Sequence, residues 1–483
     1  MGKDKKEIPP HESISKNPSN LKTRSDVKVI KGIFAVLMLL ACLWIGKILI
    51  WDAPSLQVNA YNPRVAETEK QYIRGALLDC YGNKLAYTRV TESGEERVYP
   101  YGESCAHVTG YIGKGKTGLE LAANSWLLKT AGPWESLKSW LRQEKYQGCD
   151  VVTTIDAELQ QYIYEQMEGY KGAVVVSEPS TGKILALVSA PSYDPATVID
   201  NWESISQDAD SPLYARATQG LYPPGSTFKI ITALALYREQ KDYFAYQHTC
   251  SGSILIGESS LPCYHGSAHG NLTVTQAFAR SCNTFFAGLG VALGADALAE
   301  TAERLHINET FSFALTQSAS SVVLSDEDTQ IMVGETAIGQ GKTLMTPFQL
   351  NMLTAAIANE GVLYNPYLMD SVCDQQGQVL EKFLPKWYGT LMSAAEAMYL
   401  KDLMAEVTKN GTAAELSGKA PKVWGKTGTA QVGDGKEDHS WFTGFAENEE
   451  GKKIAVTVLV ENGGTAKRAT PLAGKILEYY YSK

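Results

Sequence analysis

The feature that most constrains this chain is an apolar segment near its N-terminus, GIFAVLMLLACLWIGKILIW, at residues 32–51. As a helix rising about 1.5 Å per residue, a segment of this length spans the ~30 Å hydrocarbon core of a bilayer. Its one charged residue, Lys47, lies near the outer end between Trp44 and Trp51. Lysine and tryptophan both suit the headgroup region. The segment therefore predicts a membrane-spanning anchor.

A cleaved signal peptide is the alternative interpretation of this segment. The apolar stretch is long for a signal peptide, and the only small-x-small cleavage pattern, Val58-Asn59-Ala60, lies far downstream. We therefore favour an anchor that stays in the mature protein.

The charges that flank this segment predict its orientation. Residues 12–31 contain five lysines and arginines, whereas residues 52–71 contain two. Because cationic flanks stay in the cytoplasm, we expect residues 1–31 to form a cytoplasmic tail and the rest to lie outside. Residues 1–26 are polar and are expected to be disordered. The net charge of −9 argues against nucleic acid as a partner.

Beyond the anchor the chain changes character near residue 148, where we place a boundary between domains 52–148 and 149–483. Asp156 is a good N-cap for a following helix. Further helices are predicted over residues 118–130, 134–145, 226–240, 273–295, 346–361, 395–411 and 470–483. Hairpins are predicted over residues 172–190 and 439–462. Strands at both ends of the region, with helices between, predict an α/β (α+β) domain around a mostly antiparallel sheet.

The segment YPPGSTFKI contains a possible nucleophile and its base. Two prolines and a glycine precede a predicted helix, with Ser226 at its start and Lys229 three residues on. Residues three apart share a helix face, so a neutral lysine amine can take the serine proton while the hydroxyl attacks a carbonyl. Taken alone, the pattern more often marks a surface pair at helical spacing.

Two later segments complete a set of three. In SCNTFF, Ser281 and Asn283 present a hydroxyl and an amide that suit proton transfer and substrate binding, although such a pair is often a cap or turn. In WGKTGTAQ, Lys426 and the hydroxyls of Thr427 and Thr429 suit a carboxylate, and Gly428 suits close approach of a substrate backbone. A turn with a solvated lysine is the alternative for this segment.

In this order, the three segments are the active-site set of penicillin-binding proteins and class A β-lactamases. The chain resembles a class B penicillin-binding protein, a membrane-anchored D,D-transpeptidase of peptidoglycan. IRGALLDCYGNKLA (73–86) resembles the family's R-G-x-I-x-D-x-x-G-x-x-L-A segment, with Cys80 where arginine is usual. HVTGYIGKGKTGLE (107–120) resembles its pedestal. AIGQG, TPFQ and HSWFTGFA also fit, so the resemblance covers roughly residues 70–483.

The resemblance implies the fold of that family, a penicillin-binding transpeptidase domain over residues 149–483 preceded by a dimerisation-like pedestal over residues 52–148. It implies Ser226 as nucleophile and Lys229 as its general base. Burial and the charge of Lys426 are expected to lower the pKa of Lys229. Ser281 and Asn283 would complete the proton relay and hold the substrate.

The third motif is implied to bind the substrate's terminal carboxylate through Lys426, Thr427, Gly428 and Thr429. The backbone N–H groups of Ser226 and Thr429 would form the oxyanion hole. The implied partners are stem peptides ending in D-Ala-D-Ala, β-lactam antibiotics, and a membrane glycosyltransferase within a cell-wall synthesis complex. No cofactor is implied.

Other members of the fold fit less well. A class A β-lactamase needs a glutamate for deacylation, and no E-x-x-L-N follows Asn283 before Lys426. A class D enzyme would have S-x-V in place of S-x-N. The ~100 residues between anchor and catalytic domain are too few for a glycosyltransferase domain. A β-lactam sensor or an inactive scaffold is a second hypothesis, and a β-lactamase a third.

A cluster of cysteines and histidines in HTCSGSILIGESSLPCYHGSAHG suggests a metal site or a disulfide. Its members are His248, Cys250, Cys263, His265 and His269. The spacing is not that of a standard zinc finger, so zinc is the lesser alternative. Outside the cell a Cys250–Cys263 disulfide is favoured, with free thiols as the third possibility. The other cysteines, Cys282 among them, suggest no pairing.

Two further segments have both a functional and a simpler structural interpretation. GYIGKGKTG (110–118) contains a full G-x-x-x-x-G-K-[ST] P-loop pattern, but the polar segment before it is not a buried strand. We therefore expect an exposed turn of the pedestal and no ATP site. Trp441 and Phe442 are expected to pack in the core rather than stack on a substrate.

Overall fold

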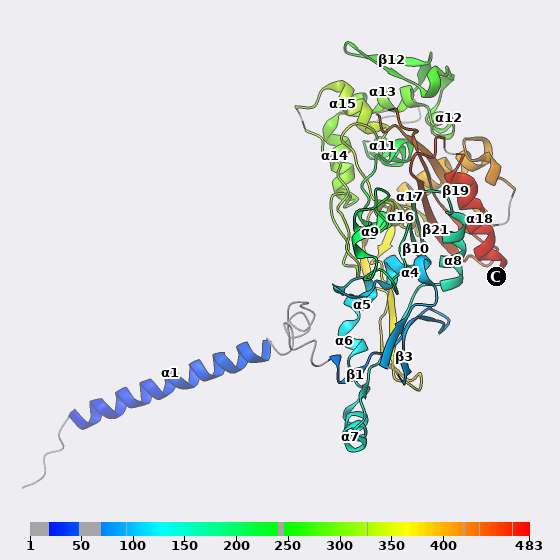
Figure 1. Ribbon diagram of the computed structural model, residues 1–483. Coiled ribbons are helices and arrows are strands. Elements are labelled where there is room, and N and C mark those ends of the chain that lie inside the picture. The colour runs from blue at the N-terminus through cyan, green and yellow to red at the C-terminus, as the bar shows by residue number, and fades with distance from the viewer. Residues whose placement is uncertain are drawn as a thin grey trace, which may run out of the picture. The chain divides into compact units, whose positions relative to one another are not determined.

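A computed structural model describes residues 19–47, 69–92, 94–239, 246–325, 327–418, 421–433, 435–465 and 467–483 (Figure 1). The chain divides into two units, Met1–Asn62 and Pro63–Lys483.

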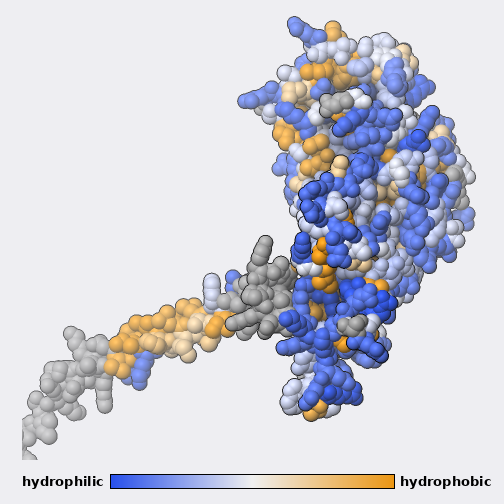
Figure 2. Space-filling view, viewed as in Figure 1, coloured by the Kyte–Doolittle hydropathy of each residue, from blue (hydrophilic) through white to orange (hydrophobic). Residues whose placement is uncertain are grey.

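The first unit contains one long helix, α1 (Ser19–Lys47). Its part Val27–Lys47 is long and apolar enough to cross a membrane, and Figure 2 shows apolar residues along its surface. The helix begins well before Gly32, so the prediction of disorder is wrong for residues 19–26. No proline or glycine between Pro18 and Gly32 interrupts the helix. Residues 48–51 of the predicted anchor, including Trp51, lie outside the described residues.

The second unit is built on a five-stranded sheet in the order β10-β9-β21-β20-β19, all antiparallel. The strands are β9 (Gly172–Glu178), β10 (Lys183–Ala190), β19 (Lys422–Ala430), β20 (His439–Glu447) and β21 (Lys453–Val460). Both predicted hairpins and the antiparallel α/β architecture are therefore confirmed. Strand β19, which contains the third motif, is at one edge of this sheet.

Helices pack on both faces of this sheet (Figure 1). α16 (Pro347–Ala358) is buried along its whole length against β9, β20 and β21. α8 (Ala157–Gln166) and α18 (Ala469–Ser482) pack against β10, β20 and β21, and α17 (Ala394–Asn410) packs against β19. The predicted cap is present, since Asp156 accepts from the Leu159 N–H at 2.9 Å. Thr346 caps α16 in the same way and accepts from the Gln349 N–H at 3.0 Å.

A second, six-stranded sheet has the order β17-β16-β8-β2-β3-β4. Its strands are β2 (Leu77–Leu78), β3 (Lys84–Thr91), β4 (Gly94–Val98), β8 (Asp150–Thr153), β16 (Met369–Cys373) and β17 (Val379–Lys382). This sheet takes strands from both sides of residue 148, and β8 pairs with β2 before it and with β16 far beyond it. The division at residue 148 stays a prediction.

The remaining elements are short. The helices are α4 (Gly102–Thr109), α5 (Gly118–Ala122), α6 (Asn124–Leu127), α7 (Pro133–Arg142), α9 (Trp202–Ser206), α10 (Arg216–Gln219), α11 (Lys229–Arg238), α12 (Val274–Ala279), α13 (Asn283–Leu293), α14 (Ala295–Arg304), α15 (Gln330–Ala337), η2 (Gly225–Phe228), η3 (Tyr264–Gly266) and η4 (Ala414–Leu416). The paired strands are β1 (Tyr72–Ile73) with β7 (Tyr146–Gln147), β5 (Ile112–Gly113) with β6 (Gly115–Lys116), β11 (His248–Cys250) with β14 (Gly270–Leu272), β12 (Ser253–Ile256) with β13 (Ser259–Pro262), and β15 (Val362–Tyr364) with β18 (Trp387–Thr390).

The segment with the P-loop pattern forms the two-stranded turn β5–β6, preceded by helix α4 rather than a strand. Gly113 and Gly115 are exposed, as expected for a turn. The helix after it, α5, has only five residues. A P-loop requires a buried strand leading into a helix N-terminus, so this local fold disfavours a nucleotide site.

A buried ion-pair network joins the segments 73–86 and 107–120, which resemble the family's N-terminal region. Glu120 is fully buried and lies 2.6 Å from Arg74 Nε and 2.7 Å from Arg97 Nε. Burial acts to raise the pKa of Glu120, but the two guanidinium charges lower it overall. Residue 75 must be glycine because a Cβ there would be 1.9 Å from the Cys149 carbonyl oxygen. The network joins α5 to the strand region of residues 72–98.

Candidate active site

A glycine turn places Ser226 beside the edge strand. Gly225 has φ 52°, and a Cβ on it would lie 2.4 Å from the Thr429 carbonyl oxygen. The turn is fixed by two hydrogen bonds, from the Gly225 N–H to the Gly339 carbonyl (2.9 Å) and from the indole N–H of Trp441 to the Pro223 carbonyl (3.0 Å). Ser226 therefore lies in a short 3₁₀ turn, η2, rather than in the α-helix predicted over residues 226–240.

Lys229 begins helix α11 and is fully buried beneath the serine. Its Nζ lies 3.0 Å from Ser226 Oγ, 2.7 Å from the Ser281 carbonyl oxygen and 2.7 Å from Asn283 Oδ1. The predicted pair of hydroxyl and amine is thus brought together with the second motif. A lysine with these three oxygens as neighbours is held in a single direction, towards Ser226.

The second motif lies at a break between two helices. A single helix was predicted over residues 273–295, and this is wrong: α12 ends at Ala279 and α13 begins at Asn283. Ser281, between them, has φ 56°, a left-handed conformation that a helix interior excludes. The break turns the Ser281 carbonyl and hydroxyl towards the two lysines, which a continuous helix would not do.

The third motif supplies a second buried lysine. Lys426 on β19 is fully buried, and its Nζ donates to Ser281 Oγ at 2.9 Å and to the Thr427 carbonyl at 2.9 Å. Thr427 Oγ1 lies 2.5 Å from Thr412 Oγ1. Thr412 was not singled out from the sequence, because it lies on a turn after α17 and belongs to no motif.

Gly428 has a packing role besides the one predicted. A Cβ on it would lie 2.9 Å from Thr227 Cγ2 and 2.9 Å from Trp441 Cβ. Its missing side chain therefore makes room for η2 and β20 of this chain. The expectation that it also makes room for a substrate backbone stays a prediction. Trp441 and Phe442 are fully buried, which confirms that they pack in the core.

Burial sets the protonation of both lysines. Desolvation lowers the pKa of Lys229 to about 7. The pKa of Lys426 is also lowered, first by burial and then by the charge of Lys229. The predicted effect of burial on Lys229 is confirmed, whereas the coupling between the lysines acts on Lys426. A neutral Lys229 near pH 7 is able to accept the Ser226 proton.

Residues of all three motifs line a cavity of about 520 Å³. Five of the predicted side chains, Ser226, Ser281, Asn283, Thr427 and Thr429, line it. His265 and His269, which the sequence placed in the cluster of cysteines and histidines, line it as well. The sequence did not indicate the other lining residues, which are Tyr264, Ser267, Arg280, Thr412, Glu415, Thr465 and Lys467. They come from loops far apart in the chain. A serine hydroxyl beside a buried amine, with further hydroxyl groups around one cavity, suits acyl transfer.

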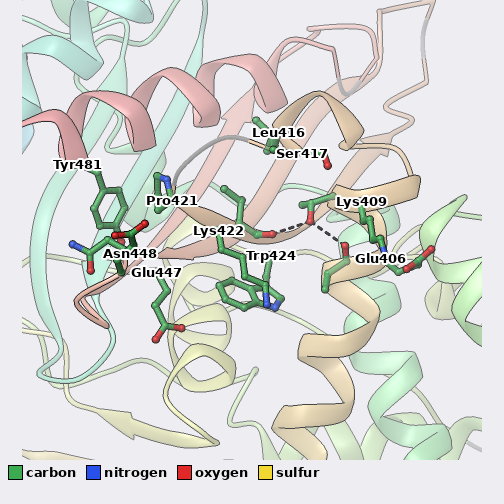
Figure 3. Close-up of a pocket in the computed structure, with 15 residues that line it drawn as sticks. Glu406, Lys409, Leu416, Ser417, Pro421, Lys422, Trp424, Glu447, Asn448 and Tyr481 are labelled. Atoms are coloured by element: carbon green, nitrogen blue, oxygen red, sulfur yellow. Dashed lines mark hydrogen bonds between the residues drawn. The ribbon is translucent and has the colours of Figure 1, made fainter.

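A larger cavity, about 1090 Å³, lies against the other end of β19 (Figure 3). Lys422 and Trp424 of β19, Lys409 of α17 and Tyr481 of α18 line it. Among the described residues that line it, only Trp424 belongs to one of the three segments, and none is a predicted site residue. We therefore place the chemistry in the smaller cavity.

A cluster of sulfur and nitrogen atoms adjoins the second motif. Cys250, Cys263, His269 and Cys282 each offer a ligand atom, and these atoms lie within 4.8 Å of one another. His269 Nδ1 is 3.5 Å from the sulfur atoms of both Cys250 and Cys263, and Cys263 Sγ is 4.0 Å from Cys282 Sγ. Around a tetrahedral zinc, with Zn–S near 2.3 Å and Zn–N near 2.0–2.1 Å, ligand atoms lie about 3.5–3.8 Å apart. The donor set and its spacing fit zinc.

The structure corrects the membership of this cluster. Cys250 and Cys263 are free thiols, so the favoured disulfide is not formed. His265 lines the catalytic cavity beside Tyr264, and His248 packs near Phe285; neither belongs to the cluster. Cys282 was missed because its position inside the second motif drew attention only to its neighbours. The spacing along the chain gives no sign that residue 282 lies next to residues 250–269, because only the fold brings them together.

Comparisons with known proteins agree with this geometry. A family model for the penicillin binding protein transpeptidase domain matches residues 172–478. A peptidoglycan D,D-transpeptidase PbpA of Mycolicibacterium smegmatis is 34% identical over 456 residues, covering 87% of this chain and 90% of that protein. The Escherichia coli peptidoglycan D,D-transpeptidase MrdA is 29% identical, covering 85% and 75%. An imipenem acyl-enzyme structure of penicillin-binding protein A from M. tuberculosis matches with a TM-score of 0.79 and 32% identity, covering 85% and 98%.

Proposed function

Because the chain belongs to the penicillin-binding protein transpeptidase family, we propose that its peptidoglycan D,D-transpeptidase activity runs through Ser226 and Lys229. The protein acts on peptidoglycan and binds β-lactams. The observation that carries the assignment is the 3.0 Å contact between Lys229 Nζ and Ser226 Oγ in a buried, low-pKa environment. Few surface pairs at helical spacing would share both properties.

In the first half-reaction, neutral Lys229 takes the Ser226 proton as Oγ attacks the carbonyl carbon between the two terminal D-Ala residues. The tetrahedral oxyanion is stabilised by the N–H groups of Ser226 and Thr429. The proton then passes through the Ser281 hydroxyl, which contacts Lys426 at 2.9 Å, to the leaving amine. The last D-Ala departs and an acyl-enzyme on Ser226 remains.

In the second half-reaction, an amine of a neighbouring stem peptide attacks the acyl-enzyme. Lys229 accepts the amine's proton and the proton returns to Ser226 Oγ as the ester bond breaks. Lys426, Thr427 and Thr429 bind the carboxylate of the donor peptide before acylation, and Asn283 orients its amide. A β-lactam follows the first half-reaction only, because its leaving amine stays attached and blocks the acceptor.

The assignment is tested by labelling the full chain with a fluorescent penicillin. We expect Ser226→Ala to reduce covalent labelling at least ~10³-fold, since the nucleophile is lost. Ser417→Ala, at the other end of β19, serves as the matched control and keeps wild-type labelling. Labelling that persists in Ser226→Ala contradicts the proposal. Product analysis with a stem pentapeptide and an amine acceptor then distinguishes the three hypotheses. A transpeptidase transfers the acyl group to the amine, a sensor retains it on the serine, and a β-lactamase hydrolyses it.

We further propose that α1 anchors the chain with its N-terminus in the cytoplasm and the transpeptidase domain, residues 149–483, outside, beyond a pedestal at residues 52–148. The excess of lysines before the apolar segment supports this orientation. A membrane glycosyltransferase in a cell-wall synthesis complex would supply the glycan strands. The exposed Cys80 tests the orientation: a membrane-impermeant maleimide should label it on cells whose cytoplasmic membrane is intact.

The cysteine cluster is proposed to hold one structural zinc through Cys250, Cys263, His269 and Cys282. Four ligands and no position for water indicate a structural rather than a catalytic site. Because Cys282 lies between Ser281 and Asn283, its ligation would fix the second motif against the β11–β14 region. When bound, the metal supplies rigidity, and no proton or electron passes through it.

Metal content of the purified full chain tests this proposal directly. We expect about one zinc per chain, lost in Cys250→Ser and retained in Cys80→Ser, a matched exposed cysteine. Cobalt substitution should give the intense sulfur-to-cobalt absorption of a thiolate site. Metal-free protein with a Cys250–Cys263 or Cys263–Cys282 disulfide by mass spectrometry would contradict it.

A further inference from the structure

Helix α7 (Pro133–Arg142, PWESLKSWLR) has its apolar stripe on the outside. Trp134, Leu137, Trp140 and Leu141 follow helical spacing, and they are 67%, 40%, 67% and 66% exposed. An amphipathic helix of a globular protein normally turns such a stripe towards the core. This helix does the reverse, so its apolar face lacks a partner within the described part of the chain.

The side of α7 that faces the body of the protein is polar. Ser136 Oγ lies 2.7 Å from Thr130 Oγ1, and Ser139 lines a small cavity with Cys149. These serines are half-buried, whereas the tryptophans are exposed. The orientation of the helix is therefore set by polar contacts, and it presents two indoles and two leucines to the surroundings.

Helix α7 lies near the point where the chain enters the second unit. Strand β1, where the chain arrives from α1, pairs in parallel with β7, and β7 follows α7 after only a few residues. Figure 1 shows α7 at one end of the second unit, close to β1. Residues 48–71 separate α1 from β1, and at about 3.5 Å per residue they extend at most ~85 Å. Because α1 is proposed as the anchor, a tether of this length keeps α7 within reach of a bilayer, so a weak affinity suffices for binding.

The side chains of this stripe have the chemistry of a membrane interface. Tryptophan prefers the headgroup region because its ring is apolar and its N–H is polar. A helix with a wide apolar stripe, and cations on the opposite side, lies in the plane of the interface. In α7 the cations Lys138 and Arg142 lie beside the stripe by helical spacing, and they form ion pairs with Glu135 and Glu144. Binding should therefore depend on apolar burial rather than on anionic lipid.

We propose that α7 lies in the outer interface of the bilayer that holds α1, with Trp134, Leu137, Trp140 and Leu141 in the headgroup–acyl boundary. The second unit then has two attachments to the membrane, the covalent tether through β1 and this helix. Two attachments restrict how the catalytic cavity tilts relative to the membrane surface. This proposal does not depend on which residues catalyse the reaction.

Hydroxyl-radical footprinting of the full chain in nanodiscs of zwitterionic lipid, one chain per disc, tests the proposal. Trp387 on β18 is the internal reference because it is 64% exposed, close to the value for the two α7 tryptophans. We expect Trp134 and Trp140 to be oxidised at least about fivefold more slowly than Trp387. Equal rates for all three would overturn the proposal.

Two variants distinguish lipid contact from other causes of protection. Leu141→Glu places a charge in the apolar stripe and should restore rapid oxidation of Trp134 and Trp140. Leu384→Glu, at a site 69% exposed, is the matched control and should leave them protected. Protection that appears only in native membranes, and not in the nanodiscs, would overturn the lipid proposal in favour of a protein partner.

Discussion

Ser281 has two lysine side chains as neighbours: its hydroxyl accepts from Lys426 and its carbonyl from Lys229. Two ammonium groups held this close in a buried site disfavour each other's charge. Lys229 also donates a hydrogen bond to the side-chain oxygen of Asn283. At the residue scale, the site is therefore a pair of buried lysines joined through Ser281, an arrangement that suits the proposed roles of Lys229 as base and Lys426 as a ligand of the substrate carboxylate.

The pKa of Lys229 predicts how acylation depends on pH. With the pKa lowered to about 7, the neutral base predominates above that pH and is lost about tenfold per unit below it. We expect the second-order rate of penicillin acylation to rise through this range and to level off above pH 8. The measurement is stopped-flow acylation from pH 5.5 to 9, with circular dichroism as the control for folding. A rate that is flat between pH 5.5 and 8.5 would contradict a lysine base.

At the scale of single elements, short irregular pieces between helices position the chemistry. The 3₁₀ turn η2 raises Ser226 towards β19, and the break between α12 and α13 turns Ser281 inwards. Both pieces use left-handed backbone, at Gly225 and at Ser281. The regular elements around them, α11, α13 and β19, hold the ends of these pieces in place.

Gly225→Ala should disable the nucleophile with little effect on the rest of the fold. The new Cβ would meet the Thr429 carbonyl oxygen at 2.4 Å, so η2 must move away from β19. A displacement near 1 Å costs about 10²-fold in rate, and we expect at least that loss of penicillin acylation. Gly257→Ala is the control, because Gly257 also has positive φ (60°) but has open space around it. Equal acylation rates in the two variants would show that the close approach is unimportant.

At the scale of the whole molecule, the second unit is held together by two sheets and by the buried Glu120 network. The six-stranded sheet joins residues before 148 to β16 and β17, so the pedestal-like region and the catalytic region share backbone hydrogen bonds. Glu120 joins Arg74 and Arg97 within the pedestal-like region. We expect loss of this carboxylate to destabilise the pedestal-like region and, through the shared six-stranded sheet, the folded second unit.

Glu120→Gln leaves two guanidinium groups without a counter-charge and should destabilise the folded state by about 3 kcal/mol or more. The carboxylate stabilises the fold above its unfolded pKa of about 4.3, and this stability is lost as the pH falls, because folding lowers the pKa of Glu120. Thermal unfolding of the full chain measures the effect. Glu96→Gln removes an exposed pair with Arg89 and should cost no more than about 1 kcal/mol. A Glu120→Gln protein as stable as this control would exclude an important role for the network.

The sequence by itself determined the anchor, the antiparallel α/β architecture and the three motifs. Each of these depends on local information: an apolar run, alternation along a strand, a cap such as Asp156, or a short pattern such as Ser226-x-x-Lys229. The family resemblance then ordered the motifs into one site, and it also argued against the complete P-loop pattern at residues 110–117. The local structure around that pattern, a helix and a β-turn, agrees with this rejection.

Tertiary structure alone decided how distant residues meet. Cys282 joins Cys250, Cys263 and His269, and Thr412 meets Thr427, because separate loops converge on one place. Gly428 fits against Thr227 and Trp441, and the apolar stripe of α7 faces outwards although its spacing is that of a core helix. Sequence periodicity shows that a helix has an apolar face, but it does not show what lies opposite that face. Packing between segments far apart in the chain determines that, and it is fixed only when the whole chain has folded.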